Sequence, residues 1–179
     1  VNHLMTHFPF HPQCEICVSA NKKRAYHRRT HMPKRKDLKR FGEIITMDLL
    51  SNYRGQVSGL EGEVEALICL DIYTNWIQVF PLAGKTEMEI ALCIHKFMGR
   101  TKVDVLYADR APEIKAAANR WGIYHEPSLP GCPQSNSLIE RCVGQVARGA
   151  RALLAASGLP ECFWPMAACA FAFGHNLQK

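Results

Sequence analysis

The stretch LPGCPQSNSLIER, residues 129–141, marks the point where a loop runs into a long helix. Its first half is rich in Pro, Gly, Ser and Asn, which are typical of turns. Its second half begins an Ala, Leu and Arg pattern that predicts a helix from Asn136 to Ala156. Glu140 lies in the first turn, where a carboxylate interacts favourably with the helix dipole. A chemical role for Glu140 therefore depends on which other acids lie near it.

Two further acids belong to strand-like segments upstream. Asp48 lies inside the apolar run Glu43–Leu50, and Asp109 follows the run Val103–Tyr107. A carboxylate in an apolar strand is costly to bury unless a cation, a metal or hydrogen bonds compensate it. Each acid also has an ordinary interpretation as a turn, cap or helix-start residue, and Arg110 could simply neutralise Asp109. Their joint placement at the ends of core elements favours a shared function.

Three carboxylates suit one particular chemistry. Oxygen donors bind two Mg²⁺ or Mn²⁺ ions, whereas His and Cys select softer metals. A pair of such ions activates water or a DNA 3′-hydroxyl and stabilises the leaving oxygen during phosphoryl transfer. We therefore expect Asp48, Asp109 and Glu140 to be catalytic metal ligands.

The remaining elements predict a mixed α/β domain built around a central sheet. Strand patterns at 64–72 and 76–82 are joined closely enough to form an antiparallel hairpin, and a brief strand is expected at 123–125. Helical patterns cover 85–98, 112–121 and 161–176. This alternation of strands and helices is typical of a sheet flanked by helices.

The first twenty residues contain the donors of a structural zinc site. His3 and His7 are one helical turn apart, and Cys14 and Cys17 form a Cys-x-x-Cys pair. Four such donors predict a tetrahedral Zn²⁺ site in residues 1–20, and His11 could replace His3 as a ligand. The alternative is a surface segment that binds no metal.

Residues 21–40 form a basic linker. Ten of the 22 Lys and Arg lie between Lys22 and Arg40, where Asp37 is the only acid. This density favours contact with the phosphate backbone of a nucleic acid, although a solvated linker or a nuclear-import signal is also compatible. The residues expected to bind nucleic acid here are Lys22, Lys23, Arg24, Arg28, Arg29, Lys34, Arg35 and Lys36.

Composition sets the remaining limits. The chain has 179 residues, 47% of them hydrophobic, and a formal net charge of +6, which allows a polyanionic partner. No window approaches the roughly 18 apolar residues of a membrane span, so we expect no membrane association. Several of the eight cysteines fall in apolar runs, which favours a reducing compartment over a disulfide framework. Because the sequence begins with Val1, we expect a piece of a longer chain.

These motifs together resemble the integrase of retroviruses and long-terminal-repeat retrotransposons, closest to the copia type. The resemblance covers nearly the whole chain, and its strength lies in the order and spacing of the motifs rather than in any one of them. The matching segments, besides the zinc donors, are Gly42-Glu43-Ile44 with Asp48, Asp71–Trp76, Lys85, Asp109–Ile114, Gly122-Ile123, Pro133–Glu140, Phe163-Trp164, Ala167 and Asn176.

The resemblance implies an RNase H-like core at residues 41–179, which is a mixed five-stranded sheet flanked by helices. It also implies that this core uses two metal ions to process DNA 3′ ends and to join them to target DNA. It also implies that Gln134 and Asn136 contact DNA near the metals. A homo-oligomer, located in the nucleus or in a cytoplasmic virus-like particle, is expected. Two rival interpretations are a non-catalytic nucleic-acid-binding module of the same fold and a simple nuclease without strand transfer.

The sequence departs from the family pattern at several positions. Between Asp109 and Glu140 there are 140 − 109 − 1 = 30 residues, where the family motif has about thirty-five. Arg110 and Ala111 replace the usual Asn-Gly, and Ser137 replaces the usual Gly. Small or apolar residues also occupy the helix one turn beyond Glu140. Phosphate contact is therefore expected from three arginines of the same helix, namely Arg141, Arg148 and Arg151.

Overall fold

A computed structural model of the chain describes residues 11–15, 37–51, 57–128 and 137–178. The chain separates into two units, Val1–Thr30 and His31–Lys179. The sheet and the helices described below all belong to the second unit.

The core of the second unit is one five-stranded mixed sheet in the order β3-β2-β1-β4-β5. Strands β1, β2 and β3 form an antiparallel meander, whereas β4 pairs parallel to β1 and β5 pairs parallel to β4. The strands are β1 (Ile44–Ser51), β2 (Glu65–Asp71), β3 (Ile77–Leu82), β4 (Val105–Ala108) and β5 (Tyr124–Pro127). The predicted α/β class and the predicted hairpin are confirmed.

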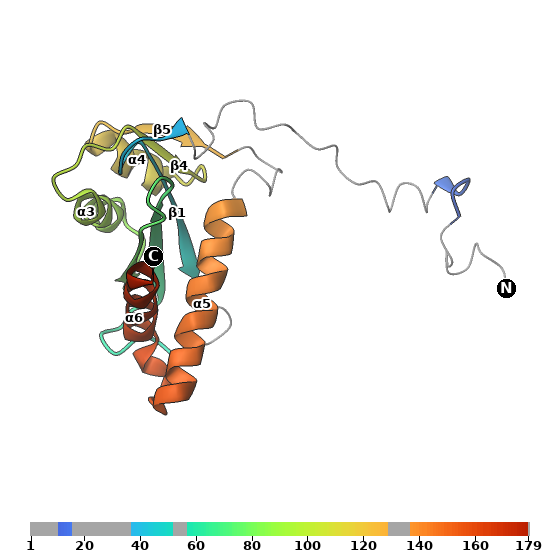
Figure 1. Ribbon diagram of the computed structural model, residues 1–179, viewed down its shortest axis with the longest axis vertical. Helices are drawn as coiled ribbons and strands as arrows, with labels where there is room; N and C mark the ends of the chain where they lie inside the picture. Colours follow the sequence, from blue (N-terminus) through green and yellow to red (C-terminus); the bar gives the residue numbers. More distant parts are fainter. Residues whose placement is uncertain (1–10, 16–36, 52–56, 129–136, 179) are drawn as a thin grey trace. The chain divides into compact units, whose positions relative to one another are not determined.

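Helices cover both faces of this sheet, so the unit has three layers (Figure 1). The α-helices among the described residues are α3 (Glu87–Met98), α4 (Pro112–Arg120), α5 (Ser137–Ser157) and α6 (Trp164–Leu177). A 3₁₀ turn, η3 (Glu161–Phe163), precedes α6, where one continuous helix was predicted. Pro165 explains the difference, because it lacks the N–H that would bond the Glu161 carbonyl in an α-helix. None of the helices in the described ranges is long and apolar enough to cross a membrane.

Two apolar cores lie on the two sides of the sheet. Ile45 and Met47 of β1 pack with α3 and α4, whereas Ile68 of β2 packs with α5 and α6. Successive side chains of a strand point to opposite faces, so Thr46 and Asp48 must project toward the side of α5. The register agrees, because Asp48 is paired with Ile68. The strand periodicity therefore decides which helix pair the Asp48 carboxylate faces.

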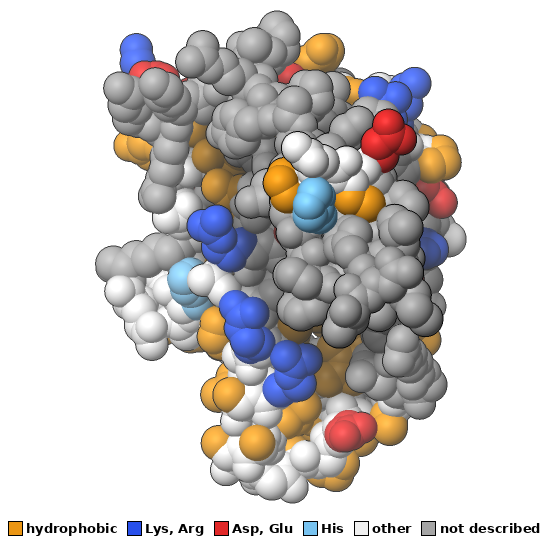
Figure 2. All heavy atoms as spheres, turned by 90° about the vertical axis from the view of Figure 1, so that its right-hand side faces the viewer, with side chains coloured by type: hydrophobic (Ala, Val, Ile, Leu, Met, Phe, Trp, Pro, Cys, Tyr) orange, Lys and Arg blue, Asp and Glu red, His pale blue; other side chains and the backbone are white. Residues whose placement is uncertain are grey.

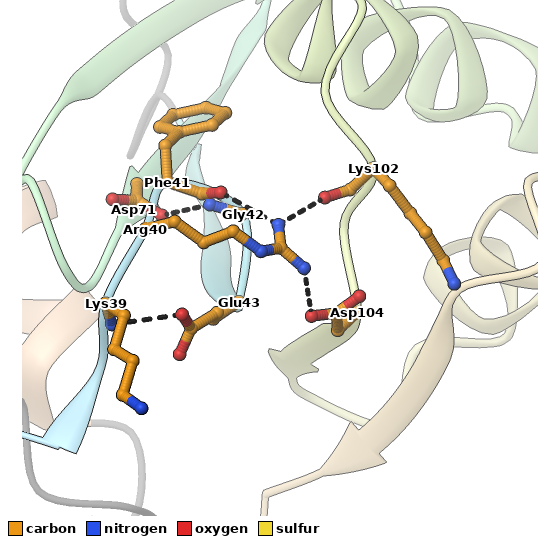
Figure 3. Close-up of polar contacts among 8 residues, drawn as sticks. All are labelled: Lys39, Arg40, Phe41, Gly42, Glu43, Asp71, Lys102 and Asp104. Atoms are coloured by element: carbon orange, nitrogen blue, oxygen red, sulfur yellow. Dashed lines mark hydrogen bonds and ion pairs between the residues drawn. The ribbon is translucent and has the colours of Figure 1, made fainter.

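Hydrogen bonds and an ion pair to residues distant in the sequence hold the segment that leads into β1 (Figure 3). Leu38 is already buried. The Arg40 guanidinium donates to the carbonyls of Phe41 and Lys102 and forms an ion pair with Asp104. The side chain of Arg40, which belongs to the basic tract in the sequence, is thus hydrogen-bonded to acceptors within the protein.

Helix α6 is held in one orientation over the edge strand β3. The Asn176 side chain accepts the Ile77 N–H at 3.0 Å and donates to the Ile77 carbonyl at 2.7 Å. On the side toward α5, Gly149 leaves room for the ring of Phe171, since a Cβ at Gly149 would lie 2.0 Å from a ring carbon. These contacts fix which face of α6 points outward.

Candidate active site

Asp48 occupies the middle of the central strand β1 and is half-buried. Its Oδ1 accepts the Leu49 N–H at 2.8 Å. Burial raises the pKa of the Asp48 carboxyl above its ordinary value of 3.8, and the negative charges of Asp109 and Glu140 raise it further. Asp109 and Glu140 are therefore each near enough to Asp48 to repel its carboxylate.

Asp109 comes directly after β4, the parallel neighbour of β1. The β1–β4 ladder ends with Thr46 paired to Tyr107; Asp48 lies two residues further along β1, and Asp109 lies just past the end of β4. Because the two strands are parallel, both acids lie toward the same end of this strand pair. The Asp109 side chain is exposed, and its Oδ1 accepts the Ala111 N–H at 3.1 Å. One of its oxygens accordingly also serves the turn that leads into α4.

Glu140 lies in the first turn of α5, and its side chain is exposed. The neighbouring Ile139 and Cys142 are buried in the core between α5 and the sheet, which fixes the rotation of the helix. This packing places the start of α5 over the face of β1 that carries Asp48. The negative charge of Glu140 contributes to the raised pKa of Asp48, which agrees with this placement.

The donor set fits hard divalent cations in its chemistry. All three side chains offer carboxylate oxygen, the ligand that Mg²⁺ and Mn²⁺ prefer, and a cation would relieve the repulsion of Asp48 by the other two acids. Asp48, Asp109 and Glu140 therefore offer the right donor atoms for such ions, but the structure, which describes all three, does not group them closely enough to hold one. Within the described ranges, no three His, Cys, Asp or Glu side chains stand grouped so that they could hold a metal ion.

Positive charge follows Glu140 along α5. Arg141, Arg148 and Arg151 are all exposed, and at about 100° per residue Arg151 lies only about 20° around the helix from Glu140. Figure 2 shows Lys and Arg side chains in a row down the face of the molecule on which α5 lies. A phosphate backbone running along this helix would meet arginines beyond the carboxylates.

The remaining predicted site residues lie outside the described residues, apart from Cys14. Cys14 is half-buried, and its N–H donates to the His11 carbonyl at 3.1 Å. The zinc segment and the nucleic-acid role of the basic tract stay predictions. The site residues outside the described ranges are His3, His7, Cys17, Lys22, Lys23, Arg24, Arg28, Arg29, Lys34, Arg35, Lys36, Gln134 and Asn136.

Two further residues near the acids had no signal in the sequence. His125 of β5 brings its Nε2 within 3.0 Å of the Asp109 carbonyl oxygen and so braces the end of β4. Thr46 is 2% exposed, and its hydroxyl has no hydrogen-bond partner in the described parts of the chain. Both positions depend on strand pairing between segments far apart in the sequence, which no local pattern reveals.

Comparison with known proteins adds no assignment, since the chain matches no protein-family model and no curated sequence. The geometry of the site and the resemblance of its motifs are therefore the grounds on which a function can be argued.

Proposed function

We propose that this chain is a retrotransposon-type integrase whose RNase H-like core cuts and joins DNA by metal-dependent phosphoryl transfer. The observation that carries the proposal is the parallel pairing of β1, which contains Asp48, with β4, which Asp109 directly follows. The strand order and the directions of the sheet are compatible with an RNase H-like core. The repulsion that Asp48 experiences from both other acids supports a shared cation site.

In this proposal Asp48, Asp109 and Glu140 would hold two Mg²⁺ or Mn²⁺ ions. When bound, the ions supply a nucleophile of lowered pKa and stabilise the charge of the leaving 3′-oxygen. In 3′-end processing, water attacks the phosphorus and the bond to the leaving 3′-oxygen breaks. In strand transfer, the new 3′-hydroxyl attacks target DNA and again displaces a 3′-oxygen. The carboxylates orient the reacting groups, and no covalent enzyme intermediate is formed.

Contact with DNA is assigned to the arginines of α5. Arg141, Arg148 and Arg151 are exposed and continue from the acids along one helix. Guanidinium groups bind phosphate oxygens without reading sequence, so the contribution is general and salt-dependent. Gln134, Asn136 and the basic tract would add contacts according to the resemblance.

The test is a Mg²⁺-dependent assay of nicking and strand transfer on labelled DNA ends. Asp48→Asn, Asp109→Asn and Glu140→Gln should each reduce both reactions by about a hundredfold or more, because metal ligands supply several kcal/mol of transition-state stabilisation. Glu161→Gln is the matched control, since Glu161 is an exposed glutamate at the start of another helical segment. If Glu140→Gln left joining unchanged, the role assigned to Glu140 would be wrong. Nicking without joining would indicate a nuclease.

A second candidate is a DNA-binding module of the same fold without catalysis. The hydrogen bond from the Ala111 N–H to Asp109 favours it, because Asp109 then acts as an ordinary turn residue. This candidate predicts salt-dependent DNA binding that none of the three acid substitutions impairs. It also predicts no cleavage with Mg²⁺ or Mn²⁺.

A further inference from the structure

Among the Phe, Tyr and Trp side chains of the described residues, the most exposed one belongs to the edge strand β5. Tyr124 exposes 67% of its surface. Trp121, three residues earlier, is held by the fold, because its indole N–H donates to the Ala91 carbonyl at 2.8 Å and its ring stacks on His95. The ring of Tyr124 instead lies open to solvent and is accessible to a ligand.

Tyr124 lies on the same face of the sheet as Asp48. The β4–β5 ladder pairs Tyr124 with Val105, and the β1–β4 ladder pairs Val105 with Ile44. Side chains paired across neighbouring strands point to the same face, and so do residues separated by two or four positions along one strand. The Tyr124 ring and the Asp48 carboxylate accordingly project from one face.

None of the described helices packs closely on this face of β5. Helix α5 packs on β1 and β2 and helix α6 packs on β3, whereas α4 contacts β5 from the opposite face. Proteins that bind single-stranded nucleic acids use such open sheet faces, on which aromatic side chains stack the bases. An open sheet face with an exposed Tyr124 ring therefore suits an unpaired base.

Glu126 adds a hydrogen-bond acceptor beside this ring. It lies two residues beyond Tyr124 on the same face, is paired with Tyr107 of β4 and is half-buried. None of the ion pairs among the described residues involves Glu126. A carboxylate repels phosphate but accepts a hydrogen bond from the amino group of a base such as cytosine. Glu126 thus disfavours the DNA backbone above β5 and favours the edge of a base.

The strand that carries this pair is fixed to the end of β4. The His125 Nε2 lies 3.0 Å from the Asp109 carbonyl oxygen, and the Ser128 N–H donates to the Ala108 carbonyl at 2.8 Å. A site held in place in this way does not have to be ordered when a ligand binds, which lowers the entropic cost of binding.

The ladder also sets the distance between the ring and the acids. Tyr124 lies three residues before Pro127, which is paired with Ala108, and Asp109 follows Ala108 directly. Three residues span about 10 Å along a strand, which equals about three base steps of a duplex. A base on Tyr124 would therefore belong to the nucleotides next to a phosphate held near Asp109.

We propose that Tyr124 and Glu126 form a binding site for an unpaired base at the end of the DNA substrate. The base stacks on the Tyr124 ring, and its amino group donates to the Glu126 carboxylate. The site thereby selects DNA ends whose last pairs are open over fully paired ends. This inference rests on the proposed function for the identity of the substrate, but binding can be measured without any catalytic step.

The first test is fluorescence anisotropy in EDTA with two labelled duplexes, one fully paired and one with three C·C mismatches at its end. The unmodified chain should bind the mismatched end more tightly. Tyr124→Ala should weaken this binding about fivefold or more, the loss expected for one stacked base, and should leave binding of the paired duplex unchanged. Tyr124→Phe keeps the ring and should bind like the unmodified chain. Trp76→Ala is the matched control, because Trp76 is 44% exposed beside β3, at the opposite edge of the sheet.

Stacking itself is measured with 2-aminopurine in the unpaired end. Its fluorescence should be quenched on binding to the unmodified chain and to Tyr124→Phe but not to Tyr124→Ala. Equal quenching and equal affinity for Tyr124→Ala would overturn the proposal and leave the proposed function standing. A chain that binds neither duplex would contradict the proposed function as well. Circular dichroism of each variant verifies that the exposed substitutions leave the fold intact.

The second test addresses Glu126 with an end of three T·T mismatches, because thymine has no exocyclic amino group. The unmodified chain should prefer the C·C end about fivefold. Glu126→Ala should abolish this preference, whereas Glu61→Ala, which removes an exposed acid before β2, should keep it. Equal affinity of the unmodified chain for both ends, or a preference that survives in Glu126→Ala, would overturn the role of Glu126.

Discussion

The buried carboxylate of Asp71 accepts the backbone N–H of Gly42 at 2.9 Å and so joins the end of β2 to the start of β1 (Figure 3). It also accepts the N–H and the hydroxyl of Thr74, both at 2.7 Å. Asp48 differs in kind. Its carboxylate accepts a hydrogen bond from the Leu49 N–H and is repelled by the negative charges of Asp109 and Glu140. Asp71 thus stabilises the fold through its hydrogen bonds, whereas Asp48 is repelled by two other acids.

Removing the Asp71 carboxylate should destabilise the protein strongly. Asp71→Ala leaves three donors without their acceptor in a site that is 0% exposed, and we expect a loss of about 3 kcal/mol or more in the free energy of unfolding. Urea denaturation measures the change. Asp104→Ala removes only an exposed ion pair with Arg40 and should cost less than about 1 kcal/mol.

Asp48→Asn should raise stability while it removes activity. The folded-state pKa of Asp48 is raised, so the folded chain holds the proton more tightly and loses stability as the pH rises above about 3.8. At pH 7 the ionised Asp48 carboxylate therefore lowers the stability of the folded chain. The uncharged amide of Asp48→Asn does not, and its oxygen can still accept the Leu49 N–H. The melting temperature of the variant should exceed that of the unmodified chain at pH 7, with the difference vanishing near pH 3. A lower melting temperature at pH 7 would contradict this, and the exposed Asp37→Asn serves as the control.

Mg²⁺ should stabilise the unmodified chain through the same acids. Binding to the folded state alone adds about 1 kcal/mol when the free metal is at five times its dissociation constant. The rise in melting temperature should be lost in Asp48→Asn and in Glu140→Gln but kept in Glu161→Gln. An equal rise in all four proteins would place the metal elsewhere.

Gly149 and Gly144 should respond oppositely to alanine, although both lie within α5. A Cβ at Gly149 would come within 2.0 Å of the Phe171 ring, whereas at Gly144 it would meet only the end of the Arg148 side chain at 3.5 Å. We expect Gly149→Ala to cost about 1–3 kcal/mol through overpacking. Gly144→Ala should gain about 0.5–1 kcal/mol from helix propensity. Thermal unfolding of the two variants measures both changes in stability. Adding Phe171→Leu to Gly149→Ala should recover part of the stability that Gly149→Ala loses.

DNA binding should depend on salt through the arginines of α5. Arg148→Gln removes one phosphate contact and should lower the slope of log K against log salt concentration by about one. Arg120→Gln is the control, because Arg120 is paired with Glu87 on the opposite face of the sheet. Fluorescence anisotropy with labelled DNA measures both slopes. Equal slopes for Arg148→Gln and the unmodified chain would exclude Arg148 from the contact.

Local patterns in the sequence were enough to predict the elements of the second unit. The hairpin of β2 and β3, the start of α4 at Pro112 and the long helix that carries Glu140 all follow from short-range periodicity and turn residues. The division of the last predicted helix into η3 and α6 depended on the position of one proline. The zinc segment and the loop with Gln134 and Asn136 lie outside the described residues and stay predictions.

The sequence by itself determined which residues could form strands and helices and which three acids had the right chemistry. Only the tertiary structure decided that the strand of Asp48 lies beside the strand that precedes Asp109, because this depends on parallel pairing between β1 and β4, which are distant in the chain. It also decided that α6 keeps an apolar face outward, since the contacts of Gly149 and Asn176 set the rotation of that helix. The physical reason is the same in both cases: local propensities act over a few residues, whereas register and helix rotation are set by packing between distant segments.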